Sequence, residues 1–255
     1  MEKSNILNLN RLFLLTRRHL LSNLTGWMIA FGALAGVLLV ISLLVAYFEP
    51  GRIAALTPAY LTIMFIGGYI FTSSIFSELN EQRKAFHYLT LPVSTTERLL
   101  SGWLLTGVLF PVFALLLIFV IIFLSNLIMN LTFDFSSINY AFSASYLKAF
   151  KTYLITQSVF LLGAAYFRKY NFLKTLLALF VVFVVFMIFT GIFSRMMFSA
   201  FMDGNMDMME SGAASFRMDS IFMNIIPQIA KILYNYLMMP FFLVVSWFSL
   251  KERQV

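Results

Sequence analysis

The chain is a series of long apolar runs separated by short polar stretches. A helix needs roughly 20 mostly apolar residues to cross a bilayer. Six runs meet this requirement, and they are Trp27–Phe48, Ala59–Ser77, Leu99–Leu124, Tyr146–Phe167, Leu173–Phe193 and Gln228–Ser249. The pattern predicts an all-α integral membrane protein, with six transmembrane helices in a single membrane domain over residues 1–255.

Composition agrees with this prediction. Hydrophobic residues make up 61% of the chain and charged residues only 11%, which is too apolar for a soluble domain. The chain has no cysteine, which excludes disulfides, thiolate metal sites and a cysteine nucleophile. The apolar run Leu20–Phe48 continues into the first span and is too long for a cleavable signal peptide, so we expect none.

The basic residues predict the orientation of the spans. Cytoplasmic segments of membrane proteins collect Lys and Arg. With both termini on the inside, 12 of the 18 Lys and Arg residues fall in inner segments, and the formal net charge of +7 lies entirely on that side. We therefore expect a multi-pass membrane protein with both termini in the cytoplasm. The positive charge is explained by topology, without a nucleic-acid partner.

The segment Ile6–Leu21 precedes the first span and is amphipathic. On a helix, one broad side carries Ile6, Leu7, Leu9, Phe13, Leu14, Leu20 and Leu21, and the other carries Asn8, Arg11, Arg18 and His19. Asn10 and Arg17 interrupt the apolar side. This arrangement is typical of a helix that lies in the membrane interface. The alternative is a polar extension of the first span. Within that span, Gly32 and Gly36 form a Gly-x-x-x-Gly pattern that permits close helix packing, either within the chain or between two chains.

The polar stretch Glu78–Arg98 lies between the second and third spans and reads ELNEQRKAFHYLTLPVSTTER. Pro92 disfavours a helical conformation at Leu91. Ser94 and Glu97 then match a capping box, which predicts that a helix begins at Thr95 and runs into the third span. Further along, Pro111 removes a helical hydrogen bond, so we expect it to kink this span.

The connection Ser194–Asn224 between the fifth and sixth spans is the longest and holds eight of the 15 methionines. Its carboxylates are Asp203, Asp207, Glu210 and Asp219. Thioethers with carboxylates permit a hypothesis of copper or divalent-metal binding. Methionine also fills apolar surface, and the connection has no His or Cys, so we favour short helices against the outer membrane face and no bound metal.

Several kinds of chemistry are missing. No glycine-rich phosphate loop occurs, so we expect no ATP hydrolysis by this chain itself. The spans contain almost no ionisable residue, whereas ion-coupled transporters usually carry some. Their polar residues are mainly Ser, Thr, Asn, Tyr and Gln157. We therefore expect neither an enzyme nor an ion-driven pump, and no cofactor bound by this chain.

The whole pattern resembles the transmembrane permease subunit of a bacterial type-2 ABC exporter. Those permeases have an N-terminal interfacial helix, six spans, a coupling helix between spans two and three, and a longer re-entrant outer segment between spans five and six. The segments Ile6–Leu21, Glu78–Arg98 and Ser194–Asn224 match these features in order. The run from Tyr88 to Arg98 also resembles the Leu-Pro-x-Ser segment found before the third span in such permeases.

The resemblance implies that the protein lies in a bacterial inner membrane and works together with other subunits. A separate cytoplasmic ATPase subunit, which binds the ATP, would dock on Glu78–Arg98. A second permease chain, identical or not, would complete a dimer. The residues to which we assign this ATPase-coupling role are Glu78, Glu81, Arg83, Lys84, Tyr88, Leu91, Pro92, Ser94, Glu97 and Arg98. Charges there would set the register of a protein interface, and apolar side chains would anchor it.

Two other readings stay open. The chain could be a membrane scaffold or assembly factor without transport activity, whose spans only anchor its loops. It could also be a metal-handling membrane protein that uses the Met-rich 194–224 segment. The sequence indicates no transported substrate.

Overall fold

A computed structural model describes residues 8–22, 24–48, 56–77, 93–133, 144–202 and 225–252. These residues form helices and short turns, and no strand occurs in these ranges. The helices are α1 (Leu9–Ser22), α2 (Leu24–Phe48), α3 (Thr57–Ser74), α5 (Thr95–Trp103), α6 (Phe110–Phe133), α7 (Ala144–Tyr166), α8 (Asn171–Met202), α10 (Ile226–Ile232) and α11 (Met238–Glu252). Two π-helical segments, η3 (Leu104–Leu109) and η6 (Leu233–Leu237), join α5 to α6 and α10 to α11.

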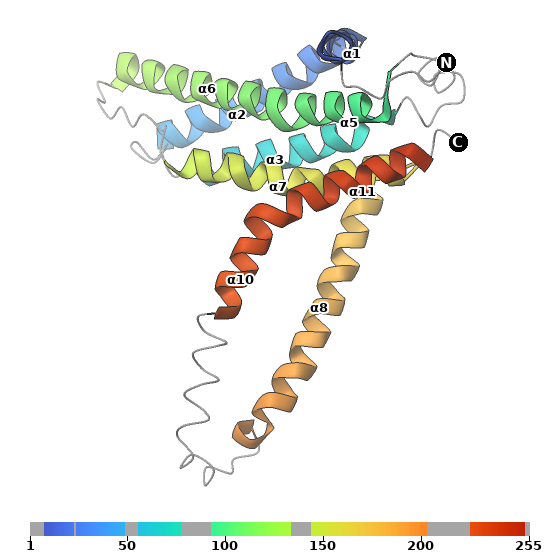
Figure 1. The fold of residues 1–255 in the computed structure, drawn as a ribbon. Coiled ribbons are helices and arrows are strands. Elements are labelled where there is room, and N and C mark those ends of the chain that lie inside the picture. The colour runs from blue at the N-terminus through green and yellow to red at the C-terminus, as the bar shows by residue number, and fades with distance from the viewer. Residues whose placement is uncertain are drawn as a thin grey trace, which may run out of the picture.

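The helices form a bundle from which two arms extend (Figure 1). Helices α2, α3, α7 and the continuous run α5–η3–α6 lie alongside one another, and α11 packs on α7 and α5. The short helix α1 packs against α5. Helices α8 and α10 leave the bundle at a steep angle (Figure 1).

Each predicted span lies almost wholly within an observed helix, so the all-helical prediction is confirmed. Three of the described helices are long and apolar enough to cross a membrane, namely Thr95–Ile128, Asn171–Met196 and Ile226–Glu252. A shorter apolar helix covers Phe31–Val45 in α2. The full set of six spans stays a prediction.

The core has two parts along the bundle. One gathers Leu38, Tyr60, Met64, Ile118 and Tyr153 from α2, α3, α6 and α7. The other gathers buried side chains nearer the start of α5, including Phe76, Leu99, Leu161 and Leu250.

Two close approaches between helices depend on glycine. A Cβ on Gly68 would overlap the hydroxyl of Tyr153, and one on Gly163 would overlap Thr175 at the start of α8.

Each π-helical segment contains the residue four positions before a proline. The carbonyl of that residue would normally accept a hydrogen bond from the backbone N–H that proline lacks. Gly107 is four residues before Pro111 and lies in η3; Tyr236 is four residues before Pro240 and lies in η6. A proline cannot donate to that carbonyl, and its ring crowds it. Local widening of the helix gives the neighbouring groups new partners, as when Phe110 N–H bonds to the carbonyl of Leu105. We expected a kink at Pro111, and the helix there contains the π-helical segment η3.

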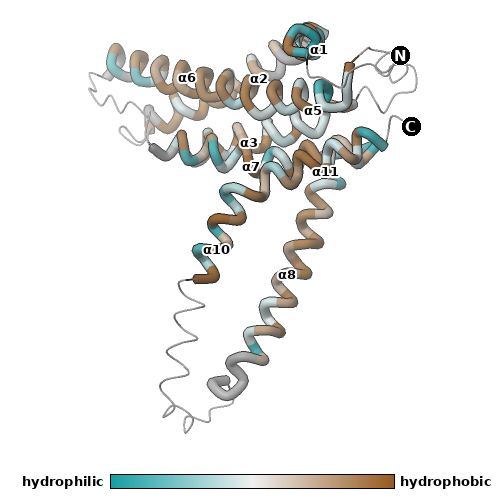
Figure 2. The backbone as a smooth tube through the Cα atoms, in the orientation of Figure 1, coloured by the Kyte–Doolittle hydropathy of each residue, from teal (hydrophilic) through white to brown (hydrophobic). Residues whose placement is uncertain are grey.

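Most of helix α8 is uncovered. Every residue from 176 to 196 is exposed in the isolated chain, and most are apolar (Figure 2). Its first turns pack on the bundle, where Asn171 and Thr175 are buried and the Asn171 side chain donates to the carbonyl of Ser73 at 3.2 Å. The helix continues to Met202, so residues 194–202 of the predicted outer segment are helical. Residues 203–224 lie outside the described ranges.

The helix ends that we predicted to be cytoplasmic gather at one end of the bundle. The end of α3, the start of α5, the turn between α7 and α8 and the end of α11 lie there, together with the start of α1 (Figure 1). A short turn at residues 167–170 joins α7 to α8, with Arg168 and Lys169 exposed and Tyr170 at a φ of 55°.

Candidate functional site

The predicted capping box at the start of α5 is confirmed. Glu97 N–H donates to the Ser94 hydroxyl at 3.2 Å, and Ser94 N–H donates to Glu97 Oε2 at 2.8 Å. Ser94 itself has an extended backbone, with φ −76° and ψ 160°, as an N-cap residue requires. The first turn of the long α5–η3–α6 run is thus held by its own side chains.

The second oxygen of the same carboxylate reaches a distant segment. Glu97 Oε1 accepts a hydrogen bond at 2.9 Å from the backbone N–H of Asn8, which is 89 residues earlier. The Asn8 side chain then accepts from the backbone N–H of Asn10 at 3.0 Å, at the start of α1. One carboxylate therefore joins the N-terminus of α1 to the N-terminus of α5. An anion is also favourable at both helix starts because helix dipoles present partial positive charge there.

Apolar packing holds the same two helices together. Leu12 and Leu15 are the buried residues of α1, and α1 packs on α5. The opposite side of α1 is exposed and mixes apolar side chains with Arg17 and Arg18. Helix α1 begins three residues later than the predicted 6–21 segment and has the amphipathic character expected of it.

Of the residues assigned to ATPase coupling, the structure describes Ser94, Glu97 and Arg98. Glu97 is 1% exposed and Arg98 is 3% exposed, so both belong to the interior of the isolated chain. Their side chains are therefore placed to hold the start of α5 and not to contact a partner directly. Glu78, Glu81, Arg83, Lys84, Tyr88, Leu91 and Pro92 lie outside the described residues.

A buried polar group links η3 to α7 in the middle of the bundle. Gln157 Nε2 donates to the Thr106 hydroxyl at 2.6 Å, and that hydroxyl donates to the carbonyl of Gly102 at 2.8 Å. The Tyr153 hydroxyl donates to the Thr106 carbonyl at 2.9 Å. Thr106, Tyr153 and Gln157 are all fully buried. The π-helical segment is therefore held to α7 through both the side chain and the backbone of Thr106. The sequence did not lead us to expect this contact.

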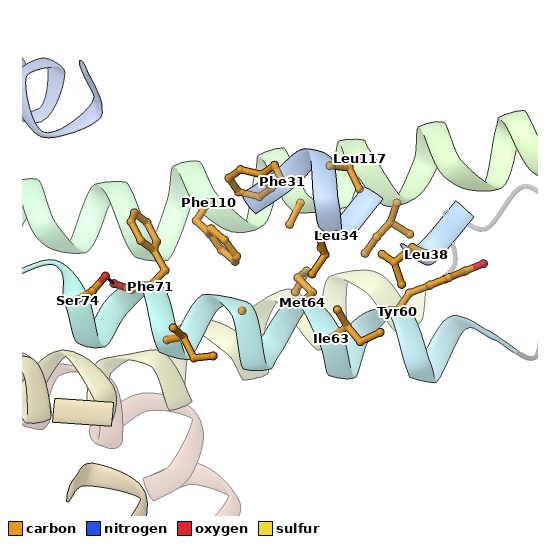
Figure 3. A pocket seen from close by; sticks show the side chains of 14 residues that line it. Phe31, Leu34, Leu38, Tyr60, Ile63, Met64, Phe71, Ser74, Phe110 and Leu117 are labelled. Atoms are coloured by element: carbon orange, nitrogen blue, oxygen red, sulfur yellow. Dashed lines mark hydrogen bonds between the residues drawn. The ribbon is translucent and has the colours of Figure 1, made fainter. Parts of the chain in front are cut away.

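An apolar cavity of about 400 Å³ lies between α2, α3 and α6 (Figure 3). Its lining residues are Phe31, Leu34, Leu38, Tyr60, Ile63, Met64, Gly67, Ile70, Phe71, Ser74, Phe110, Ala114, Leu117 and Ile118. The Tyr60 hydroxyl is hydrogen-bonded to Ser42, and Ser74 donates to the Phe71 carbonyl at 2.8 Å. The cavity therefore offers apolar surface and no unpartnered hydroxyl.

The described residues contain no group of three or more His, Cys, Asp or Glu side chains that could hold a metal ion. The carboxylates of the Met-rich segment, Asp203 to Asp219, lie outside these residues, so the metal-handling alternative stays open.

Comparisons with protein-family models, with curated proteins and with solved structures found no match for this chain.

Proposed function

We propose that the chain is the membrane-spanning permease subunit of an ATP-driven type-2 ABC exporter. A separate cytoplasmic ATPase would bind ATP and dock on the segment 78–98. Movement of that ATPase would then be passed into the membrane helices through the start of α5.

The observation that carries this proposal is the double use of Glu97. Its carboxylate caps α5 through Ser94 and holds the start of α1 through Asn8. A force applied just before Ser94 would therefore act on a helix that is stiff from its first turn. It would act at the same time on α1, which has the character of an interfacial helix.

The run from Thr95 to Phe133 gives this force a path. It is continuous through the π-helical segment and packs on α2, α3 and α7. The Gln157–Thr106 bond ties the middle of the run to α7. A displacement of the first turn would thus reach several membrane helices.

A second permease chain is part of the proposal. A Cβ added at Gly32 or Gly36 would meet nothing within 4 Å in the described chain. The Gly-x-x-x-Gly surface of α2 is therefore not used for packing between described helices, which favours its use between two chains.

The test is docking of an ATPase on the segment 78–98. The full chain is purified in mild detergent from its own membranes, co-purifying nucleotide-binding proteins are identified, and ATP hydrolysis is measured after reconstitution. Glu81→Lys and Arg83→Glu should weaken both copurification and chain-stimulated hydrolysis without loss of membrane insertion. Glu252→Lys, a reversal at an exposed site on α11, is the matched control.

Two results would count against the proposal. One is wild-type chain that stimulates no ATP hydrolysis by any co-purified protein. The other is a set of segment variants that couple as well as Glu252→Lys does. Either result would favour the scaffold reading.

A further inference from the structure

Two apolar cavities of the bundle meet at the same three side chains. The cavity of about 400 Å³ between α2, α3 and α6 is lined in part by Phe31, Phe71 and Phe110. A second cavity of about 290 Å³, between α1, α2, α3 and the η3–α6 run, is lined by the same three phenylalanines. Phe31 and Phe110 line both cavities and lie side by side (Figure 3), with ring centroids 5.6 Å apart. We call the two cavities together the phenylalanine groove.

The walls of the groove match an aliphatic guest. The hydroxyl of Tyr60 is bonded to Ser42, and that of Ser74 is bonded to a backbone carbonyl. A polar guest would lose its hydrogen bonds to water and find no free partner on these hydroxyls, which is costly. Each cavity is close to or within the size range of small-molecule sites, about 300–1,000 Å³.

The groove opens to the surface beside α1, on the side of the helix that carries Arg17. Leu20, Met28 and Phe113 line the second cavity and are 42%, 67% and 53% exposed. Arg17 is exposed and lies three residues before Leu20, on a neighbouring position of the helix surface. Arg17 thus lies next to the opening of the phenylalanine groove, whereas Arg18 lies further round the surface of α1.

We propose that the phenylalanine groove holds one acyl chain of an anionic membrane phospholipid, with the phosphate of its headgroup at Arg17. A guanidinium binds phosphate well, and a cation next to a membrane attracts anionic lipid. The inference rests on the chain being a membrane protein. It does not need an ATPase, so it can fail or succeed independently of the proposed exporter function.

Gly67 offers a way to close the groove. It lines the larger cavity, and a Cβ there would be 3.7 Å from the ring of Phe110, an ordinary contact. Gly67→Leu should therefore extend into the space that the acyl chain occupies. Gly191→Leu is the matched control, because Gly191 lies on exposed α8 and a Cβ there meets nothing within 4 Å.

The experiment titrates the purified full chain with phosphatidylglycerol or phosphatidylcholine in detergent and counts bound lipids by native mass spectrometry. One phosphatidylglycerol should bind about fivefold more tightly than phosphatidylcholine, the effect of one cation near a membrane surface. Gly67→Leu should weaken its binding at least tenfold. Arg17→Gln should remove the preference for phosphatidylglycerol, while Arg18→Gln and Gly191→Leu should bind as wild type does.

Two outcomes would overturn the proposal. The first is a Gly67→Leu chain with wild-type helical content and elution volume that binds phosphatidylglycerol as tightly as Gly191→Leu. The second is an equal loss of lipid preference in Arg17→Gln and Arg18→Gln. If Gly67→Leu does not accumulate, Ile63→Phe fills the larger cavity from another position, and unchanged lipid binding by that variant overturns the proposal as well.

Discussion

Asn8 and Glu97 are 89 residues apart, and the backbone N–H of one donates to the carboxylate of the other at 2.9 Å. The same carboxylate accepts the Ser94 N–H at 2.8 Å. Two helix starts thus share one buried anion, which is 1% exposed. Asn8 is exposed and Ser94 is half-buried, so the loss of the carboxylate would leave both backbone N–H groups to find new partners, including water.

Replacement of Glu97 should separate these two helix starts. Glu97→Ala removes both acceptors, and a hydrogen bond to a charged group contributes roughly 1.5–3 kcal/mol. Glu97→Gln keeps one amide oxygen, so it should be less destabilising than Glu97→Ala. Thermal unfolding in detergent should show this order, and spin labels on exposed positions of α1 and α7 should report a broader distance distribution in Glu97→Ala alone. Identical unfolding temperatures for the two variants would mean that the carboxylate does not hold both starts.

Loss of the Thr106 hydroxyl should destabilise the middle of the bundle. In Thr106→Val, Gln157 Nε2 loses its 2.6 Å acceptor in a fully buried place, at a cost of roughly 1–3 kcal/mol. Gln157→Leu alone removes the other partner. Because the two residues share one hydrogen bond, the double variant should be less destabilised than the two single changes added together. Additive losses in unfolding temperature would show that this bond contributes little.

Local signals in the sequence predicted the local structure well. The capping box depends on two residues three apart, so Ser94 and Glu97 were recognisable without knowledge of the fold. Pro111 was predicted to disturb its helix for a similar reason, since a proline acts on the carbonyl four residues before it, and η3 lies there. Pro240 stands in the same relation to η6.

Relationships between distant helices could not be read from the sequence. The partner of Glu97 is a backbone N–H, which every residue except proline carries, so nothing marks Asn8 in advance. Gln157 was visible as a polar residue in a span, but only the packing of η3 on α7 brings it to Thr106. The phenylalanine groove is formed by side chains from four elements, whose pairing an apolar pattern does not specify.

The two ends of α7 offer a direct test of topology. Lys148 is exposed near its start, and Lys169 is exposed in the turn after its end. The helix has 23 residues, which corresponds to a length of about 35 Å, enough to cross the hydrocarbon core. Since the chain has no cysteine, Lys148→Cys and Lys169→Cys give single labelling sites. A membrane-impermeant maleimide should label position 148 only from outside and position 169 only from the cytoplasm. Labelling of positions 148 and 169 from the same side would contradict the six-span arrangement.

The Ser94 cap allows a test of coupling that leaves the fold in place. Ser94→Ala removes the hydroxyl that accepts the Glu97 N–H at 3.2 Å, and loss of such a cap costs about 0.5–2 kcal/mol. That is small beside the burial of several apolar helices, so the variant should insert and accumulate normally. If the start of α5 carries motion from an ATPase, its frayed first turn should lower chain-stimulated ATP hydrolysis in reconstituted vesicles.

Ser94→Asp supplies another good cap oxygen, but its charge lies close to Glu97, so Ser94→Thr is the cleaner rescue variant. We expect hydrolysis to fall in Ser94→Ala and to return in Ser94→Thr at equal levels of inserted protein. Equal stimulation by wild type and Ser94→Ala would show that the capped helix start does not transmit the motion, and the double use of Glu97 would then be a purely structural feature.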